Sequence, residues 1–200
     1  MIWWLKIRAA PALAVGLVGT FTMGLLVGSS ELPVPALAGQ AGQFLVGHLI
    51  TLAPAVLLMF GMGRGDLRTE SVASRPTRGW DVVLALATAT ASLAMAALCH
   101  LLWSTSIAIV LGRNISGYIG IALFLHPLVG HRAAGALIAV VPLFCAAAGW
   151  GPGGRPEPWA WLLHSADSLL AIVLAAATLA AGVTMALTRR QPLWDINSIR

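Results

Sequence analysis

The stretch GRGDLRTESVASRPTRG, Gly63 to Gly79, is the only long polar run in an otherwise apolar sequence. It holds four of the twelve Lys and Arg residues. Loops rich in Lys and Arg stay on the cytoplasmic side of a membrane, because these residues resist translocation whereas acidic residues have little effect. The run therefore predicts a cytoplasmic loop, with two apolar segments before it and four after it.

The composition is typical of an integral membrane protein. Of the 200 residues, 58% are hydrophobic and 10% are charged, whereas soluble domains carry about 25% charged residues. A membrane span needs about 20 mainly apolar residues, so six spans with short connections fill this length and leave no room for a soluble domain. The net charge of +5 lies at segment ends and not on one basic face, which favours contact with anionic lipid over nucleic acid.

The apolar segments predict an all-α fold, a single bundle of six transmembrane helices in the plasma membrane. The expected spans are residues 9–28, 40–62, 80–103, 107–125, 133–150 and 159–187. Ten Lys and Arg residues fall on the side of the polar run, Arg155 alone falls on the other side, and Arg113 lies within a span. This asymmetry predicts that both termini are cytoplasmic and that the loop GPGGRPEP, residues 151–158, is outside.

Two further patterns concern packing and the membrane interface. Small residues recur every four positions in the first span, at Gly16, Thr20, Gly24 and Gly28, which predicts close approach of another helix. All eight tryptophans fall at or near the ends of expected spans, which is typical of an aromatic belt. They are Trp3, Trp4, Trp80, Trp103, Trp150, Trp159, Trp161 and Trp194.

Polar residues inside the spans are the candidate functional residues, because such residues are expensive in a bilayer. At about 1.5 Å per residue, six of them are expected in one tier of the outer half: His48, His100, Arg113, Asn114, His164 and Asp167. One interpretation is an ion pair between Arg113 and Asp167, with histidines capping helix ends. The other is a polar patch that faces a substrate path. A metal site is not expected, because no two of these ligands lie four positions apart on one helix.

An enzymatic interpretation is the weaker one. Ser116-Gly117 and His164 resemble the serine and histidine of rhomboid intramembrane proteases, which also have six core spans. However, Asn114 stands where the GxSG motif of that family has its first glycine, and Ser165 to Asp167 replace small packing residues. The chain is therefore not expected to be an enzyme. It also lacks a phosphate-binding glycine-rich loop, so no cofactor is expected on this chain.

Two stretches carry a resemblance to a transporter family. RNISGYIGIALFLHPLVGHRAAG, residues 113–135, and LRTESVASRPTRGW, residues 67–80, resemble parts of small six-span permeases of high-GC Gram-positive bacteria, similar to ABC-2 type exporter permeases. The resemblance implies an export permease that pairs with a second permease chain and with separate ATPase subunits, which hold ATP and Mg. The polar run would then couple to the ATPase through Asp66, Leu67, Arg68, Glu70 and Val72.

Two alternatives remain open at this point. The substrate-binding subunit of an energy-coupling-factor importer also has about 200 residues and six spans. The four small residues of the first span, Gly16, Thr20, Gly24 and Gly28, which we call the Gly16 ladder, would then dock onto a scaffold subunit. The third possibility is a non-transport accessory subunit of a membrane complex. Asp167 is the only acid expected clearly within a span, which favours a partner ATPase over proton coupling.

Overall fold

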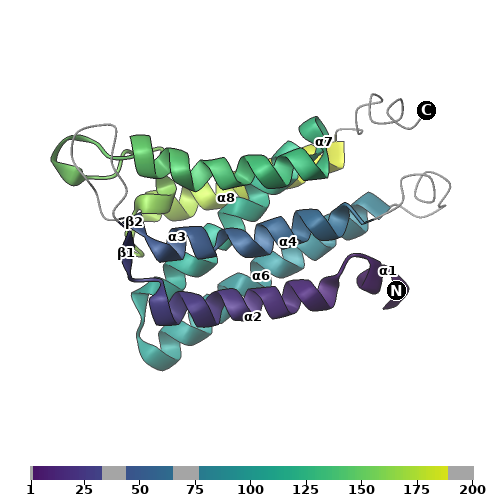
Figure 1. The fold of residues 1–200 in the computed structure, drawn as a ribbon, viewed down its shortest axis with the longest axis horizontal. Coiled ribbons are helices and arrows are strands. Elements are labelled where there is room, and N and C mark those ends of the chain that lie inside the picture. Colours follow the sequence, from purple (N-terminus) through teal and green to yellow (C-terminus); the bar gives the residue numbers. More distant parts are fainter. Residues whose placement is uncertain (1, 33–43, 65–76, 189–200) are drawn as a thin grey trace.

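The computed structural model describes residues 2–32, 44–64 and 77–188, and it is mostly helical (Figure 1). The helices are α1 (Ile2–Ile7), α2 (Ala10–Val27), α3 (Val46–Ile50), α4 (Leu52–Met62), α6 (Thr77–Trp103), α7 (Ser106–Ala148) and α8 (Leu169–Thr188). Two short 3-10 turns are η1 (Pro152–Gly154) and η2 (Trp161–Leu163), and the strands β1 (Glu31–Leu32) and β2 (Phe44–Leu45) pair antiparallel. The expected all-α class is confirmed.

Four described helices are long and apolar enough to cross a membrane, namely Ala10–Val27, Gly79–Trp103, Ser106–Ala148 and Leu169–Thr188. A shorter apolar helical stretch covers Val46–Met62, where α3 and α4 follow each other through Thr51. The Thr51 hydroxyl donates to the carbonyls of Gly47 and His48 at 3.0 Å. This back-bonding places the junction inside the bundle without an unsatisfied hydroxyl.

The longest helix, α7, is two arms joined at Gly130. Gly130 has φ 79° and ψ 167°, a conformation that is non-helical and that only glycine adopts easily. Arg113, near the start of α7, donates to the His164 carbonyl, and Gly149, directly after the end of α7, lies against Leu163, so both ends of α7 meet the segment before α8. The chain therefore reverses at Gly130, and the two arms, teal and green in Figure 1, run in opposite directions along the bundle.

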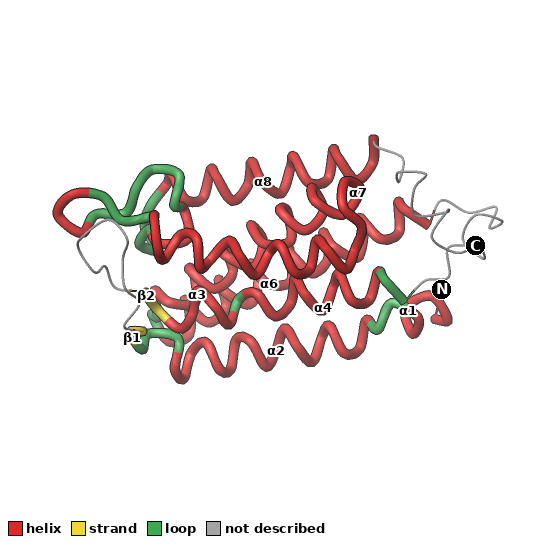
Figure 2. The backbone as a smooth tube through the Cα atoms, turned by 45° about the horizontal axis from the view of Figure 1, so that its top comes forward, coloured by secondary structure: helices red, strands yellow, loops and turns green. Residues whose placement is uncertain are grey.

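The bundle has two distinct ends (Figure 2). We call one the basic end, because the exposed residues Lys6, Arg64 and Arg132 belong to it. There Gly61 abuts the Arg8 carbonyl, and Gly63 abuts the His131 ring. The other is the loop end, formed by β1, β2 and residues 149–168.

The small residues of α2 pack against helices of the same chain. Gly16 lies against Leu57 of α4, and Gly24 lies against Leu111 of α7. Thr20 is buried, and its hydroxyl donates to the Gly16 carbonyl at 2.7 Å. The Gly28 carbonyl accepts the Gly47 amide at 3.0 Å. The ladder is thus filled from within the chain.

A second close contact joins α7 to α8. A Cβ atom on Gly182 would overlap the carbonyl oxygen of Gly120, and one on Gly120 would lie 2.5 Å from the Leu179 amide nitrogen. Both glycines are buried. The first arm of α7 and α8 therefore meet backbone to backbone, in the manner that small residues allow between membrane helices.

The segment before α8 differs from expectation. The helix begins at Leu169 and not at Trp159, with the Ser168 hydroxyl accepting the Ala171 amide at 3.3 Å as a cap. Residues 160–163 instead fold into the bundle, and the side chains of Trp161 and Leu162 are buried. Trp161 and Trp150 are therefore core residues and not members of an aromatic belt.

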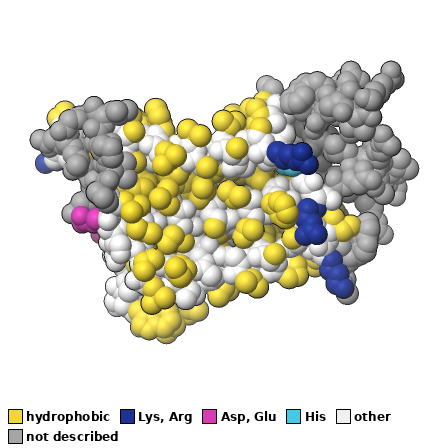
Figure 3. Space-filling model, viewed as in Figure 1, with side chains coloured by type: hydrophobic (Ala, Val, Ile, Leu, Met, Phe, Trp, Pro, Cys, Tyr) yellow, Lys and Arg dark blue, Asp and Glu magenta, His cyan; other side chains and the backbone are white. Residues whose placement is uncertain are grey.

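Large apolar side chains are exposed on the outside of the bundle. Among the most exposed are Val15 and Leu26 on α2, Leu101 on α6, Leu143 on α7 and Leu169 on α8. Figure 3 shows this on one face, where hydrophobic side chains form a broad band and the charged side chains lie at the two ends. An apolar surface of this extent is typical of a protein that faces lipid.

Candidate functional site

The buried guanidinium of Arg113 is the centre of the candidate site. Arg113 lies in the second turn of α7 and is only 3% exposed. Its Nη1 donates to the Ser165 carbonyl and its Nη2 to the His164 carbonyl, each at 2.8 Å. Its Nε donates to Asn114 Oδ1 at 3.3 Å. All three acceptors are neutral, so the positive charge has no carboxylate partner among the described residues.

The expected ion pair between Arg113 and Asp167 is not formed. The prediction placed Asp167 in a helix that begins at Trp159, but α8 begins at Leu169. Asp167 consequently lies in the irregular segment before α8, where its side chain is exposed. The backbone of that segment, and not its carboxylate, reaches Arg113.

Asn114 links Arg113 to His48 and fixes the protonation of the imidazole. Because Arg113 Nε can only donate, Asn114 Oδ1 must accept, and the amide Nδ2 then faces His48 Nδ1 at 3.1 Å. Nδ2 donates, so Nδ1 accepts and the neutral ring carries its proton on Nε2. We call His48, Arg113 and Asn114 the Arg113 cluster.

Aromatic residues from three elements surround this cluster. The Phe44 ring lies 5.3 Å from the His48 ring, and the Tyr118 hydroxyl donates to the His48 carbonyl at 3.0 Å. The Trp161 ring covers Gly117 and meets Tyr118 edge to face at 6.1 Å. Gly117 has no side chain, which allows this indole to enter the bundle. The cluster is consequently enclosed by apolar rings near the loop end.

The remaining candidate residues lie apart from the cluster. The His100 ring Nδ1 is 3.2 Å from the Thr105 carbonyl, in the turn between α6 and α7. The His164 ring faces away from Arg113, with Nε2 3.1 Å from the Glu157 carbonyl and Nδ1 3.4 Å from the Ser168 hydroxyl. The structure therefore brings together His48, Arg113 and Asn114 of the six predicted residues, and His164 only through its backbone.

Ser116 does not meet His164. Its hydroxyl donates to the Gly112 carbonyl at 2.9 Å and lies 3.4 Å from the hydroxyl of Ser92 on α6. A serine protease needs the serine and histidine within hydrogen-bond reach, and this pair is not formed among the described residues. The predicted coupling residues, Asp66 to Val72, lie outside the described residues.

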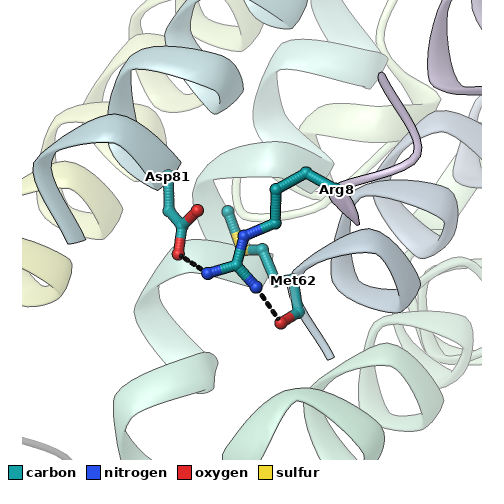
Figure 4. Close-up of polar contacts among 3 residues, drawn as sticks. All are labelled: Arg8, Met62 and Asp81. Carbon is teal, nitrogen blue, oxygen red and sulfur yellow. Dashed lines mark hydrogen bonds and ion pairs between the residues drawn. The ribbon is translucent and has the colours of Figure 1, made fainter. Parts of the chain in front are cut away.

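A second buried arginine was missed as a site by the sequence analysis, which counted it only as an inside charge. Arg8 is 2% exposed; its Nη1 donates to the Met62 carbonyl at 2.5 Å and its Nη2 to Asp81 Oδ2 at 2.9 Å (Figure 4). These residues come from the turn between α1 and α2, the end of α4 and the start of α6. The available signal was Asp81 itself, an acid placed directly after Trp80 at the start of an apolar run.

No protein-family model, curated protein or solved structure matches the chain. The resemblance to ABC-2 type permeases therefore stays a prediction.

Proposed function

We propose that this chain is the membrane-spanning permease subunit of an ABC-type transporter, energised by separate ATPase subunits. The observation that carries the proposal is the Arg113 cluster, a buried cation with neutral partners inside an apolar bundle. An ionisable group inside a membrane bundle is costly and is a functional hypothesis by default. The resemblance of residues 113–135 to exporter permeases favours export as the direction.

The proposal includes six spans with both termini in the cytoplasm. The spans are α2, α3 with α4, α6, the two arms of α7, and α8. The exposed apolar side chains between the two ends support this arrangement. The exposed cations Lys6, Arg64 and Arg132 gather at the basic end, and the positive-inside rule assigns that end to the cytoplasm.

The positions of the acids favour an external energy source. The described acids are Glu31, Asp81, Glu157 and Asp167, and each lies at one of the two ends of the bundle. Proton-driven carriers rely on carboxylates within the membrane, and the described helices place none midway along the bundle. A partner ATPase that binds ATP and Mg supplies the energy instead, and a second permease chain completes the assembly.

The enclosure of the Arg113 cluster favours a second candidate, the substrate-binding subunit of an energy-coupling-factor importer. A capture subunit must hold its substrate within one chain, and here a single chain surrounds the cluster and covers it with residues 160–165. The Gly16 ladder does not support scaffold docking, because Leu57 and Leu111 of the same chain occupy it.

Purification of the tagged chain from its native membrane, with identification of bound proteins, tests these assignments. Two ATPase subunits with a second permease support the exporter, whereas a distinct scaffold subunit supports the importer. A complex without an ATPase refutes both and indicates an accessory subunit. The double variant Arg68→Ala/Glu70→Ala then tests the polar run: loss of stimulated ATPase activity with normal insertion supports coupling, and unchanged activity refutes it.

A further inference from the structure

We infer that the Arg113 cluster binds an oxyanion, a carboxylate or phosphate group, which takes the place of the His164 and Ser165 carbonyls on the guanidinium. The inference rests on the proposed function, because it names the chemistry of the ligand at the same site. Three features of the cluster support it: the geometry of the donors, the uncompensated charge and the state of His48.

The first feature is the fork of donors on Arg113. Nη1 and Nη2 each donate to one of two consecutive carbonyl oxygens at 2.8 Å. A planar guanidinium presents the same two nitrogens to a carboxylate or phosphate, whose two oxygens accept in parallel. Three of the five N–H groups have acceptors among the described residues. The anion would accept from Nη1 and Nη2 in place of the two carbonyls, while Nε keeps its bond to Asn114.

The second feature is charge. The three acceptors around Arg113 carry only partial negative charge, although Arg113 is only 3% exposed to solvent. A buried cation is stabilised far more by an anion than by neutral dipoles, because attraction between full charges is strong where water is excluded. The cluster therefore favours an anionic ligand and opposes a cationic one.

The third feature is His48, which is also 3% exposed. The Asn114 amide requires the proton on Nε2, and no hydrogen bond of that nitrogen is found in the described part of the chain. His48 and Arg113 bond to the same carboxamide, so the site offers a second N–H donor of the kind that an oxyanion accepts.

The carbonyls that occupy the fork belong to an irregular segment. Residues 164–168 lie between η2 and α8, and the side chain of Ser165 is exposed. The Ser165 carbonyl also accepts the Ser168 amide, at 3.3 Å. Withdrawal of His164 and Ser165 therefore breaks no bond of a regular helix, and it opens the fork toward the loop end.

The test uses the purified full chain in an uncharged detergent. Thermal unfolding is followed with sodium phosphate against sodium chloride at equal ionic strength. We expect phosphate to raise Tm in a concentration-dependent way, as a ligand of the folded state does. Arg113→Lys keeps the charge but loses the fork, so the apparent affinity should fall about tenfold or more. His48→Gln should weaken it independently, and the control Arg132→Gln, at the basic end, should respond like the parent.

A second arm distinguishes the source of the oxyanion. The chain is reconstituted in nanodiscs of phosphatidylglycerol or of phosphatidylcholine, and retained lipid is counted by native mass spectrometry. Phosphatidylglycerol retained by the parent and lost in Arg113→Lys, without a response to free phosphate, assigns the site to a lipid headgroup. A response to phosphate assigns it to a soluble oxyanion.

Two results overturn the inference: no response in either arm, or equal responses in the parent and Arg113→Lys. These outcomes are separable from failure of the proposed function. Co-purification of an ATPase without any anion response removes the binding site alone. An anion response without an ATPase partner keeps the site and removes the transporter assignment.

Discussion

Arg8 and Asp81 form an ion pair, with Nη2 2.9 Å from Oδ2, although 73 positions separate the two residues. The same guanidinium donates to the Met62 carbonyl, so one side chain ties the turn between α1 and α2 to α4 and α6 at the basic end. Arg113 does the same at the loop end, where it joins α7 to the segment before α8. The bundle is thus held at both ends by buried arginines that bond to backbone carbonyls.

Replacement of the acid in this pair should destabilise the chain. Asp81→Asn keeps an acceptor but removes the carboxylate charge beside the buried Arg8 guanidinium, and we expect the free energy of unfolding to fall by about 3 kcal/mol. Denaturation of the purified chain in mixed micelles measures it. Lys6→Gln, an exposed charge in α1, is the matched control and should change little. Equal stability of Asp81→Asn and the parent would contradict a structural role for the pair.

The contact of Gly182 with Gly120 gives a prediction with opposite signs at two glycines. Gly182→Ala places a methyl group on the Gly120 carbonyl, so α7 and α8 must separate, and we expect a loss of about 1–3 kcal/mol in unfolding free energy. Gly19→Ala meets no atom within 4 Å and should stabilise α2 by about 0.5–1 kcal/mol. Thermal unfolding of the two variants in one detergent compares them. If both variants shift Tm in the same direction, the result contradicts the close contact between Gly182 and Gly120.

Composition and periodicity were sufficient for the helical class, because apolar runs of this length have few alternatives in a membrane. They did not place residues 159–168. The apolar residues from Trp159 onward predicted the start of a helix. Trp161 folds inward instead, and it can do so only because Gly117, in another part of the chain, has no side chain. Such a pairing depends on the tertiary arrangement, which hydropathy along the chain does not contain.

The candidate site was predictable only in part, because hydropathy gives the depth of a residue but not its tertiary contacts. Depth along a helix placed His48, Arg113 and Asn114 in one tier, and they do meet. Depth does not specify which acceptor a cation chooses. Backbone carbonyls outside regular helices carry no sequence signal, so the carbonyls of His164 and Ser165 were overlooked and Asp167, the visible acid, was selected.

The two neighbouring tryptophans near the loop end should respond differently to truncation. Trp161 is 6% exposed, and Trp159 is 44% exposed against Phe144. We expect Trp161→Ala to cost about 3–5 kcal/mol, the usual loss for a large buried side chain, and Trp159→Ala to cost clearly less. Chemical unfolding followed by circular dichroism measures both. A larger loss for Trp159→Ala would mean that residues 160–163 do not enter the bundle.

The orientation of the bundle is tested by cysteine labelling, and it decides which compartment the Arg113 cluster faces. Cys99 and Cys145 are free but buried, so the parent chain should label weakly and serves as the control. Ser29 is exposed at the loop end, whereas Ser71 belongs to the polar run that predicts the cytoplasmic side. In intact cells an impermeant maleimide should label Ser29→Cys, and it should label Ser71→Cys only after permeabilisation. The reverse pattern would invert the bundle and place the Arg113 cluster near the cytoplasmic face, so that an anion would reach the fork from inside the cell.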